Sequence, residues 1–256
     1  MNEPTSSFFA EDATCAKMAA EKSSSPSQKP ISPKQWKPVG IKPYYEDDSV
    51  FLIHGDCREI VPLLGRFDLL LTDPPYGIGK DKGAAPGGTD GSGRYKRNPK
   101  QYEGEWDSER PSPVLFADLI LSSRDAIIWG GNYFADILPR GGRWLFWDKK
   151  NNMPSFSDGE MAWTNIAGVS VKKFTHYNQC VDDAREHPTQ KPLQLMRWCL
   201  GFADDAVTIL DPFAGSGTTG RACKDLNRKC TMIEREERYC EIAARRMGQE
   251  VLNLGD

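Results

Sequence analysis

The stretch Phe67-Asp68-Leu69-Leu70-Leu71-Thr72-Asp73-Pro74-Pro75-Tyr76 decides the fold and the place of the candidate site. Residues 67–72 predict a buried strand, because the run is short, mostly apolar and followed at once by breakers. Two successive prolines end the strand, since proline cannot donate to a sheet ladder. In open parallel sheets, ligands bind just outside the carboxyl ends of strands. The carboxylate of Asp73, the carbonyls of Pro74 and Pro75 and the ring of Tyr76 suit a planar group that carries an amino substituent.

Other apolar runs alternate with helical segments, which predicts an α/β fold with a doubly wound, mostly parallel sheet and helices on both faces. We expect strands at 50–53, 126–129, 144–148, 206–210 and 230–233. We expect helices at 58–64, 113–124, from 193 onward, from about 218 and at 236–247. Residues 149–186 are less regular.

A glycine-rich turn follows the strand at 206–210 and precedes a helix. It reads Asp211-Pro212-Phe213-Ala214-Gly215-Ser216-Gly217-Thr218-Thr219, and this strand–turn–helix order is typical of a nucleotide cradle. The next strand ends at Glu234, 23 residues after Asp211, where a carboxylate can accept ribose hydroxyls. Asp56 follows the strand at 50–53 and can either cap the next helix or accept from an adenine amino group.

Two other cofactor classes share parts of this pattern. Residues 215–220 fit G-x-G-x-x-G, but Asp-Pro-Phe before the glycines suits a zwitterionic amino acid better than a pyrophosphate. A dehydrogenase acid–base pair is also not apparent. A P-loop would need Lys and Ser or Thr where Arg221 and Ala222 stand.

Together with His187-Pro188-Thr189-Gln190-Lys191-Pro192, these motifs resemble the beta class of amino-methylating DNA methyltransferases over about residues 45–250. The resemblance implies a seven-stranded Rossmann-like sheet, S-adenosylmethionine as cofactor and methylation of the adenine N6 amino group in double-stranded DNA. It implies that the amine donates to Asp73 and the Pro74 carbonyl, and that the flipped base stacks on Tyr76. The implied catalytic residues are Asp73, Pro74, Pro75 and Tyr76. The implied cofactor contacts are Asp56, Thr189, Lys191, Asp211, Phe213, Gly215, Ser216, Gly217, Thr218 and Glu234.

Several alternatives remain open on the sequence alone. The same chemistry serves the cytosine N4 amino group, although Asp rather than Ser before Pro-Pro favours adenine within the family. Similar motifs also serve RNA or protein-amide methylation. A non-catalytic DNA-binding module is the remaining alternative.

Two segments are candidate DNA contacts. Residues 77–110 lack periodicity and predict a mobile lid that binds phosphates through Lys80, Lys82, Arg94, Lys96, Arg97 and Lys100. Residues 149–186 form the candidate target-recognition region, in which Lys149 and Lys150 are candidate phosphate contacts.

Composition sets the remaining expectations. With 256 residues and 39% hydrophobic content, the chain fits one domain at 45–256 after a tail at 1–44 that we expect to be disordered. The net charge of −3 requires any DNA-binding charge to be local. Seven cysteines without close spacing predict reduced thiols and no metal site, and the chain has no apolar run of membrane-helix length. The reduced thiols and the lack of such a run predict a cytoplasmic protein. We expect its source to be a bacterium or a virus of one, and a homodimer is possible because dimers are common in the resembled class.

Overall fold

The computed structural model describes residues 36–78, 110–150, 157–177 and 190–249. The predicted phosphate-binding lysines and arginines at 80–100 and Thr189 lie outside these ranges. The predicted lid is therefore described only at its two ends, 77–78 and 110.

The described residues form one mixed sheet of nine strands, in the order β1-β2-β9-β8-β3-β4-β6-β5-β7. The strands are β1 (Tyr45–Glu46), β2 (Val50–His54), β3 (Phe67–Thr72), β4 (Ser123–Trp129), β5 (Arg143–Asp148), β6 (Gly159–Thr164), β7 (Lys172–Thr175), β8 (Thr208–Asp211) and β9 (Lys229–Glu234). β1 pairs antiparallel with β2, and β6 pairs antiparallel with both β4 and β5, whereas the other neighbours pair parallel. The prediction of a mostly parallel sheet is confirmed, and its strand number is corrected from seven to nine.

The strand order reverses between β3 and β8, which lie side by side in the middle of the sheet. The chain continues from β3 to its neighbour β4 on one side, and from β8 to β9 on the other. The last residue of β8, Asp211, accepts a hydrogen bond from the hydroxyl of Thr72, the last residue of β3, at 2.8 Å. The motifs that follow β3 and β8 therefore start next to each other at a topological switch point.

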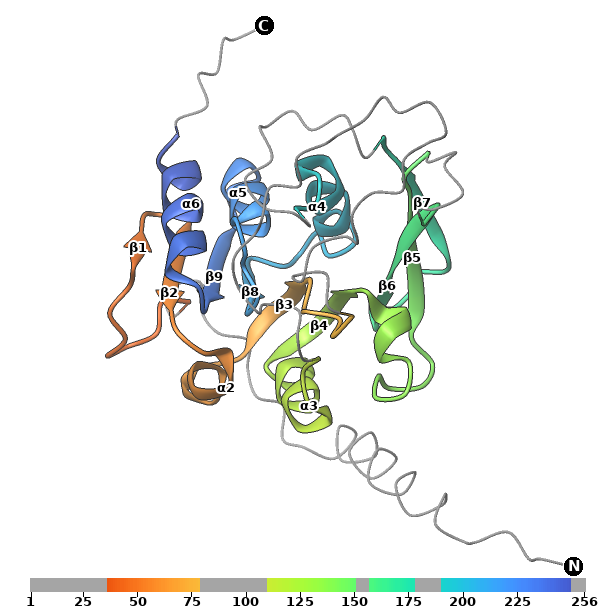
Figure 1. The fold of residues 1–256 in the computed structure, drawn as a ribbon, viewed down its shortest axis with the longest axis horizontal. Helices are drawn as coiled ribbons and strands as arrows, with labels where there is room; N and C mark the ends of the chain where they lie inside the picture. Colours follow the sequence, from red (N-terminus) through yellow and green to blue (C-terminus); the bar gives the residue numbers. More distant parts are fainter. Residues whose placement is uncertain (1–35, 79–109, 151–156, 178–189, 250–256) are drawn as a thin grey trace, which may run out of the picture.

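Helices cover both faces of the sheet (Figure 1). One face carries α4 (Leu193–Leu200), α5 (Thr218–Asp225) and α6 (Glu237–Gly248), and the other carries α2 (Cys57–Ile60), η1 (Val61–Leu63) and α3 (Pro113–Leu121). A short helix, η3 (Gly131–Phe134), follows β4.

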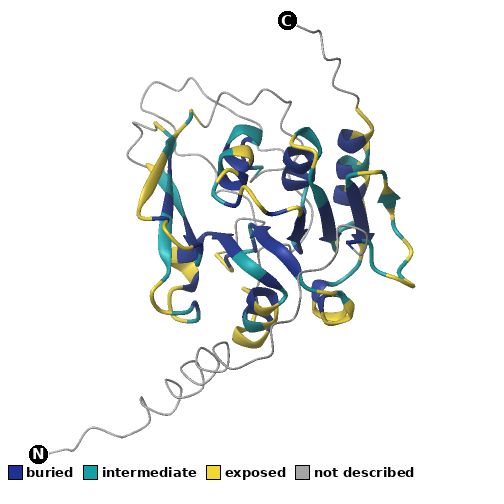
Figure 2. Cartoon of the chain, turned by 180° about the vertical axis from the view of Figure 1, so that it is seen from behind, coloured by how far each residue is buried: buried dark blue, intermediate teal, exposed yellow. Residues whose placement is uncertain are grey.

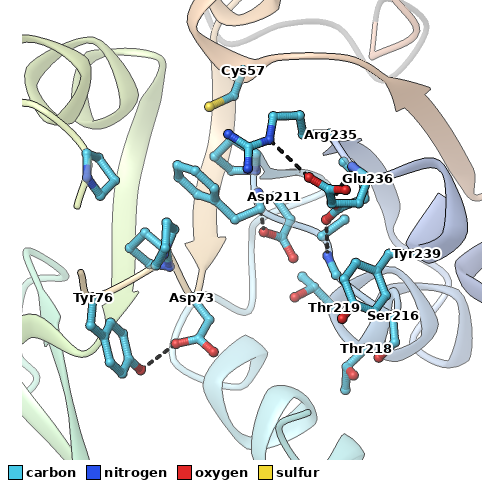
Figure 3. Close-up of a pocket in the computed structure, with 18 of the residues that line it drawn as sticks. Cys57, Asp73, Tyr76, Asp211, Ser216, Thr218, Thr219, Arg235, Glu236 and Tyr239 are labelled. Atoms are coloured by element: carbon cyan, nitrogen blue, oxygen red, sulfur yellow. Dashed lines mark hydrogen bonds and ion pairs between the residues drawn. The ribbon is translucent and has the colours of Figure 1, made fainter. Parts of the chain in front are cut away.

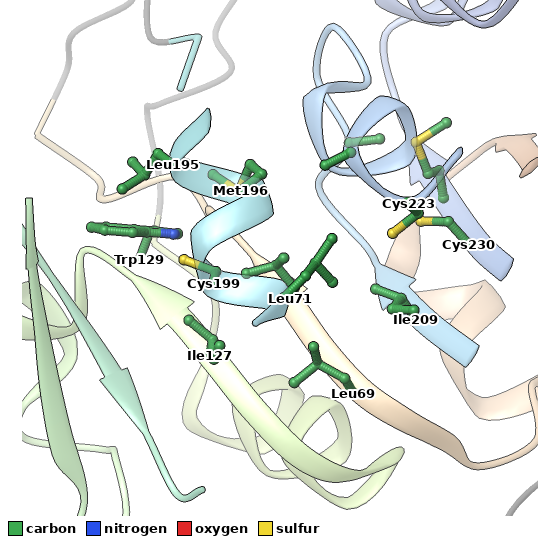
Figure 4. Close-up of a cluster of buried hydrophobic side chains, with 14 of the residues drawn as sticks. Leu69, Leu71, Ile127, Trp129, Leu195, Met196, Cys199, Ile209, Cys223 and Cys230 are labelled. Carbon is green, nitrogen blue, oxygen red and sulfur yellow. The ribbon is translucent and has the colours of Figure 1, made fainter. Parts of the chain in front are cut away.

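Alternate side chains of β3 enter the two cores because successive residues of a strand point to opposite faces. Leu69 and Leu71 pack with the α4 side chains, as Figure 4 shows, whereas Leu70 between them joins the α3 side. Burial on both faces explains why 67–72 is a nearly continuous apolar run. Figure 2 shows the resulting buried strands between exposed outer helix faces.

Several sequence-based assignments need correction, among them those of a helix end, an irregular region and the N-terminal tail. The helix predicted to end at Arg124 ends at Leu121, and β4 already begins at Ser123. The irregular region 149–186 contains β6 and β7. The predicted tail ends earlier than residue 44, because the Trp36 ring is buried in the α3-side core and its carbonyl accepts from Thr231 at 2.8 Å.

The expected reduced thiols are consistent with the five described cysteines, which are all free and buried. Among the residues that the structure describes, no cluster of His, Cys, Asp and Glu could hold a metal ion. No helix in these ranges is both long and apolar enough to cross a membrane.

Candidate active site

A cavity of about 340 Å³ opens at the carboxyl ends of β3, β8 and β9. Its volume lies in the range of roughly 300–1,000 Å³ that is usual for small-ligand sites. Figure 3 shows Asp73 and Tyr76 on one side of it and Asp211 and the glycine-rich turn on the other. The structure therefore brings together most of the predicted residues: Asp56, Asp73, Pro74, Pro75, Tyr76, Lys191, Asp211, Phe213, Gly215, Ser216, Thr218 and Glu234 all line this cavity.

Asp73 and Tyr76 form a direct contact at the end of β3. The Tyr76 hydroxyl donates to Asp73 Oδ1 at 2.6 Å. Burial, together with the negative charges of Asp73 and Glu160, raises the pKa of the Tyr76 hydroxyl well above its ordinary value. Tyr76 is therefore a neutral donor at physiological pH, and it fixes the direction of the carboxylate.

The Tyr76 ring is stacked on a second aromatic ring. Tyr133 of η3 lies with its ring centroid 4.7 Å from that of Tyr76 and its plane at 17°. Tyr76 is buried, whereas Tyr133 is 40% exposed. Gly130 lies close by, because a Cβ added there would come within 2.1 Å of the Tyr76 ring. A base that stacks on Tyr76 must therefore take the place of Tyr133 or add to the stack.

Lys191 was predicted to contact the cofactor, but its ammonium lies among the side chains on the Asp73 side of the cavity. It forms an ion pair with Asp73 Oδ2, donates to the Tyr76 hydroxyl at 3.3 Å and lies 3.0 Å from Glu160 Oε2. Burial alone would lower the pKa of Lys191, but Asp73 and Glu160 outweigh it and raise that pKa. Lys191 is therefore a permanent cation bound to the candidate catalytic carboxylate.

Asp211 is buried at the centre of the site, beside the end of β3. Its Oδ1 accepts from the Thr72 hydroxyl and, at 3.2 Å, from the Phe213 amide. Burial raises the pKa of Asp211 to about 6, although hydrogen bonds from Thr219, Thr72 and Phe213 oppose that rise. Asp211 thus holds the glycine-rich turn against β3.

Glu234, the last residue of β9, binds the glycine-rich turn on the side opposite Asp211. Its Oε2 accepts from the Gly215 amide at 2.7 Å, and its Oε1 accepts from the Glu236 amide at 2.9 Å. Burial raises the pKa of Glu234 despite these two bonds. An ionised carboxylate has about four lone-pair positions, so Glu234 can accept further hydroxyl donors from the cavity.

Gly217 does not line the cavity but makes the turn possible. Its φ of +78° is in the left-handed region, and an added Cβ would lie 3.0 Å from Ala243 of α6. Ser216 and Thr218 flank it and are tied to α6. Arg246 Nη1 donates to the Ser216 carbonyl at 2.8 Å, the Ser216 hydroxyl at 3.1 Å and the Thr218 hydroxyl at 3.3 Å.

Asp56 performs the capping role that the sequence allows. It accepts from the Arg58 amide at 2.8 Å as the N-cap of α2, and both of its carboxylate oxygens accept from the Arg58 side chain. These bonds, chiefly the one from the Arg58 side chain, lower the pKa of Asp56. The adenine contact stays a prediction, and Asp56 does line the cavity.

The two described lysines of the predicted DNA contacts differ in placement. Lys149 is not placed for phosphate binding, because its side chain is largely buried and its ammonium pairs with Glu160. Lys150 is exposed and stays a predicted contact.

Three side chains of the site were not identified from the sequence. Tyr133 and Arg246 carry no local motif that distinguishes them from ordinary helix residues. Glu160 stands in the run Gly-Glu-Met-Ala-Trp-Thr, and an acid within an otherwise apolar strand was the signal that could have revealed it.

The comparisons with known proteins agree with this geometry. A family model described as DNA methylase matches residues 128–245. The chain is 28% identical to the Type II methyltransferase M.HpaI of Haemophilus parainfluenzae over 72% of this chain and 68% of that protein. It is 29% identical to the Type II methyltransferase M2.MboI of Moraxella bovis over 80% of this chain and 91% of that protein.

Solved structures resemble the fold as well. The structure described as the M1.HpyAVI-SAM complex matches with a TM-score of 0.51 and 25% identity, and the match covers 78% of this chain and 100% of that chain. The PvuII DNA methyltransferase, which is named cytosine-N4-specific, matches with a TM-score of 0.58 over 83% of this chain and 91% of that chain. Its identity is 17%, so this second likeness concerns the fold alone.

Proposed function

We propose that this chain is an amino-methylating DNA methyltransferase and that it transfers the methyl group of S-adenosylmethionine to the N6 amino group of adenine in DNA. One observation carries the proposal. The Asp73 motif and the glycine-rich turn line one cavity, and the Thr72–Asp211 hydrogen bond joins the ends of the two strands that carry them. A two-substrate reaction needs both binding sites side by side.

The residues on the cofactor side of the cavity fit S-adenosylmethionine. The carboxylate of Glu234 has lone pairs left to accept ribose hydroxyls, and Asp211 suits a positively charged amino group. Phe213 and Tyr239 add aromatic surface to the lining. When bound, S-adenosylmethionine supplies a methyl group on a positively charged sulfur.

The residues on the Asp73 side of the cavity act on the exocyclic amine of the target base. An exocyclic amine is a poor nucleophile, because its lone pair is delocalised into the ring. Hydrogen bonds from the amine to Asp73 and to the Pro74 carbonyl favour a tetrahedral nitrogen and free that lone pair. Tyr76 and Lys191 each donate to one oxygen of Asp73, and the remaining lone pairs can accept the amine. The protein thus contributes positioning and electrostatic stabilisation.

The target base leaves the duplex in this proposal, because its amine cannot reach Asp73 from within the stack. Asp73 rather than Ser before the two prolines supports adenine over cytosine, since the resembled family uses Asp mainly for adenine.

The test is transfer of labelled methyl from S-adenosylmethionine to unmethylated DNA, followed by nucleoside analysis. We expect N6-methyladenine, and Asp73→Ala should lower the rate at least about 100-fold while the Kd for S-adenosylmethionine stays within about threefold. N4-methylcytosine in the product would overturn the choice of base. Absence of transfer to DNA by a protein that binds the cofactor would overturn DNA as the substrate.

A further inference from the structure

Glu160 is a largely buried acid that faces the candidate catalytic residues from β6. This strand lies antiparallel between β4 and β5, and Glu160 pairs in register with Trp147. Its side chain is 18% exposed and lines the cavity, yet the methyl transfer as described makes no use of it. A buried carboxylate without a role in the chemistry needs a physical reason, because burying a charge is costly unless the charge is paired.

Two lysines supply the pairing and link Glu160 to Asp73. Lys149 at the end of β5 pairs with Glu160 Oε1, and Lys191 lies 3.0 Å from Glu160 Oε2. Lys191 in turn pairs with Asp73 Oδ2. The four charges alternate along the row Lys149, Glu160, Lys191 and Asp73, and the side chain of Lys191 in the middle is only 5% exposed.

The arrangement fixes the Lys191 ammonium from two sides. Burial alone would raise the pKa of Glu160, but Lys191 and Lys149 lower it to about 2, so this carboxylate stays ionised at neutral pH. Without Glu160, the described ion-pair and hydrogen-bond partners of Lys191 would be Asp73 and the Tyr76 hydroxyl, and its flexible chain would be free to shift.

We propose that Glu160 is a positioning residue for the methyl transfer, because it holds the Lys191 ammonium against Asp73 Oδ2. With Oδ2 bound to Lys191 and Oδ1 bound to Tyr76, the plane of the Asp73 carboxylate is fixed and its free lone pairs point to one place for the amine. The inference rests on the proposed function. Glu160 acts through Lys191 and does not itself touch the base.

The first measurement compares steady-state kinetics of wild type and Glu160→Gln on DNA. Misplacement of a reacting group by about 1 Å can cost about 100-fold in rate. We therefore expect kcat to fall about 10- to 100-fold, while the Kd for S-adenosylmethionine stays within about twofold. Glu160→Asp keeps the negative charge but moves it away from Lys191 by one methylene. The kcat of this variant should therefore lie between those of wild type and Glu160→Gln. The Asp variant also keeps the test decisive if the Gln variant does not fold.

Asp225 offers a matched control. This carboxylate is also shared by two cations, Arg197 and Arg221, and its side chain is only 8% exposed, but it does not line the cavity. Asp225→Asn should leave kcat within about twofold of wild type, whatever it costs in stability.

A double-mutant cycle tests whether Glu160 acts through Lys191. In a Lys191→Met background, Glu160→Gln should lower kcat by less than about twofold further, because its target is already gone. Unchanged kcat in Glu160→Gln or Glu160→Asp, or a full additional loss in the Lys191→Met background, would overturn the inference and leave the proposed function intact. A wild-type protein that transfers no methyl to DNA would overturn both.

Discussion

At the scale of single residues, Asp211 links ionisation to stability. Its folded pKa of about 6 is above the value of about 3.9 in an unfolded chain, so the folded protein holds this proton at pH values where the unfolded chain has released it. The stability gained from this proton is complete below the unfolded pKa and is lost as pH rises through 6. Above pH 6 the Asp211 carboxylate is ionised, so the folded protein bears the full free-energy cost of burying its charge.

Asp211→Asn should remove that cost. The amide oxygen can still accept from Thr72 and Phe213, and the Thr219 hydroxyl can turn to accept from the amide nitrogen. We expect the variant to gain on the order of 2 kcal/mol of stability over wild type at pH 8, and little at pH 4. Thermal unfolding of the free protein at both pH values measures the difference. An equal gap at pH 4 and pH 8 would show that the charge of Asp211 is not its cause.

The Tyr76–Tyr133 stack yields a second prediction at this scale. A stacked aromatic pair is worth about 1 kcal/mol, and this energy opposes a base that needs the same face of Tyr76. Tyr133→Ala should therefore lower the KM for DNA about fivefold with little change in kcat, whereas Tyr133→Phe keeps the stack and should behave as wild type. A KM that rises in Tyr133→Ala would mean that Tyr133 itself contacts the base.

At the scale of elements, the strands that carry the site were predictable, whereas β6 and β7 were not. The strand that precedes Asp73 and the strands that end at Asp211 and Glu234 are apolar runs closed by breakers or acids, because both of their faces are buried. β7 is short and largely exposed, so its sequence Lys-Lys-Phe-Thr shows no alternation of apolar and polar residues. β6 enters the sheet antiparallel between β4 and β5, and this long-range pairing leaves no local mark on the sequence. Without a predicted strand at 159–164, the single acid Glu160 in its apolar surroundings does not stand out.

The tie between α6 and the glycine-rich turn gives the prediction at this scale. Arg246 is buried and bonds to both Ser216 and Thr218, so its loss frees the turn to move. Arg246→Met should weaken S-adenosylmethionine binding about tenfold by calorimetry, since the turn must then be ordered on binding. The neighbouring Arg245 is exposed, and Arg245→Met should bind as wild type. Equal Kd values for the two variants would show that the turn is rigid without Arg246.

At the scale of the whole molecule, the site depends on an arrangement that only the sheet order supplies. Asp73 and Asp211 are 138 positions apart in the sequence and meet because β3 and β8 are neighbours. Sequence motifs identified both of them, since each carries its own local signal. The ion pairs of Lys191 could not be predicted, because they join β3, β6 and the segment before α4, and no local pattern encodes such a contact.

Ligand binding should therefore stabilise the fold as a unit. The cavity is lined from the turn after β2, the ends of β3, β8 and β9, and the start of α6, so a cofactor bound there would join segments that are far apart in the sequence. S-adenosylmethionine at about 100 times its Kd should add about 2.7 kcal/mol of stability. This gain corresponds to a Tm increase of roughly 5–10 °C for a domain of this size.

Glu234→Ala should abolish most of that increase at the same ligand concentration, because it removes an acceptor and releases the Gly215 amide. Asp205→Ala is the control, since Asp205 is exposed and pairs only with Arg124 among its described contacts. Each variant is compared with its own ligand-free Tm, so that lost stability is not mistaken for lost binding. A full Tm increase in Glu234→Ala would show that the acid holds the turn without contacting the cofactor.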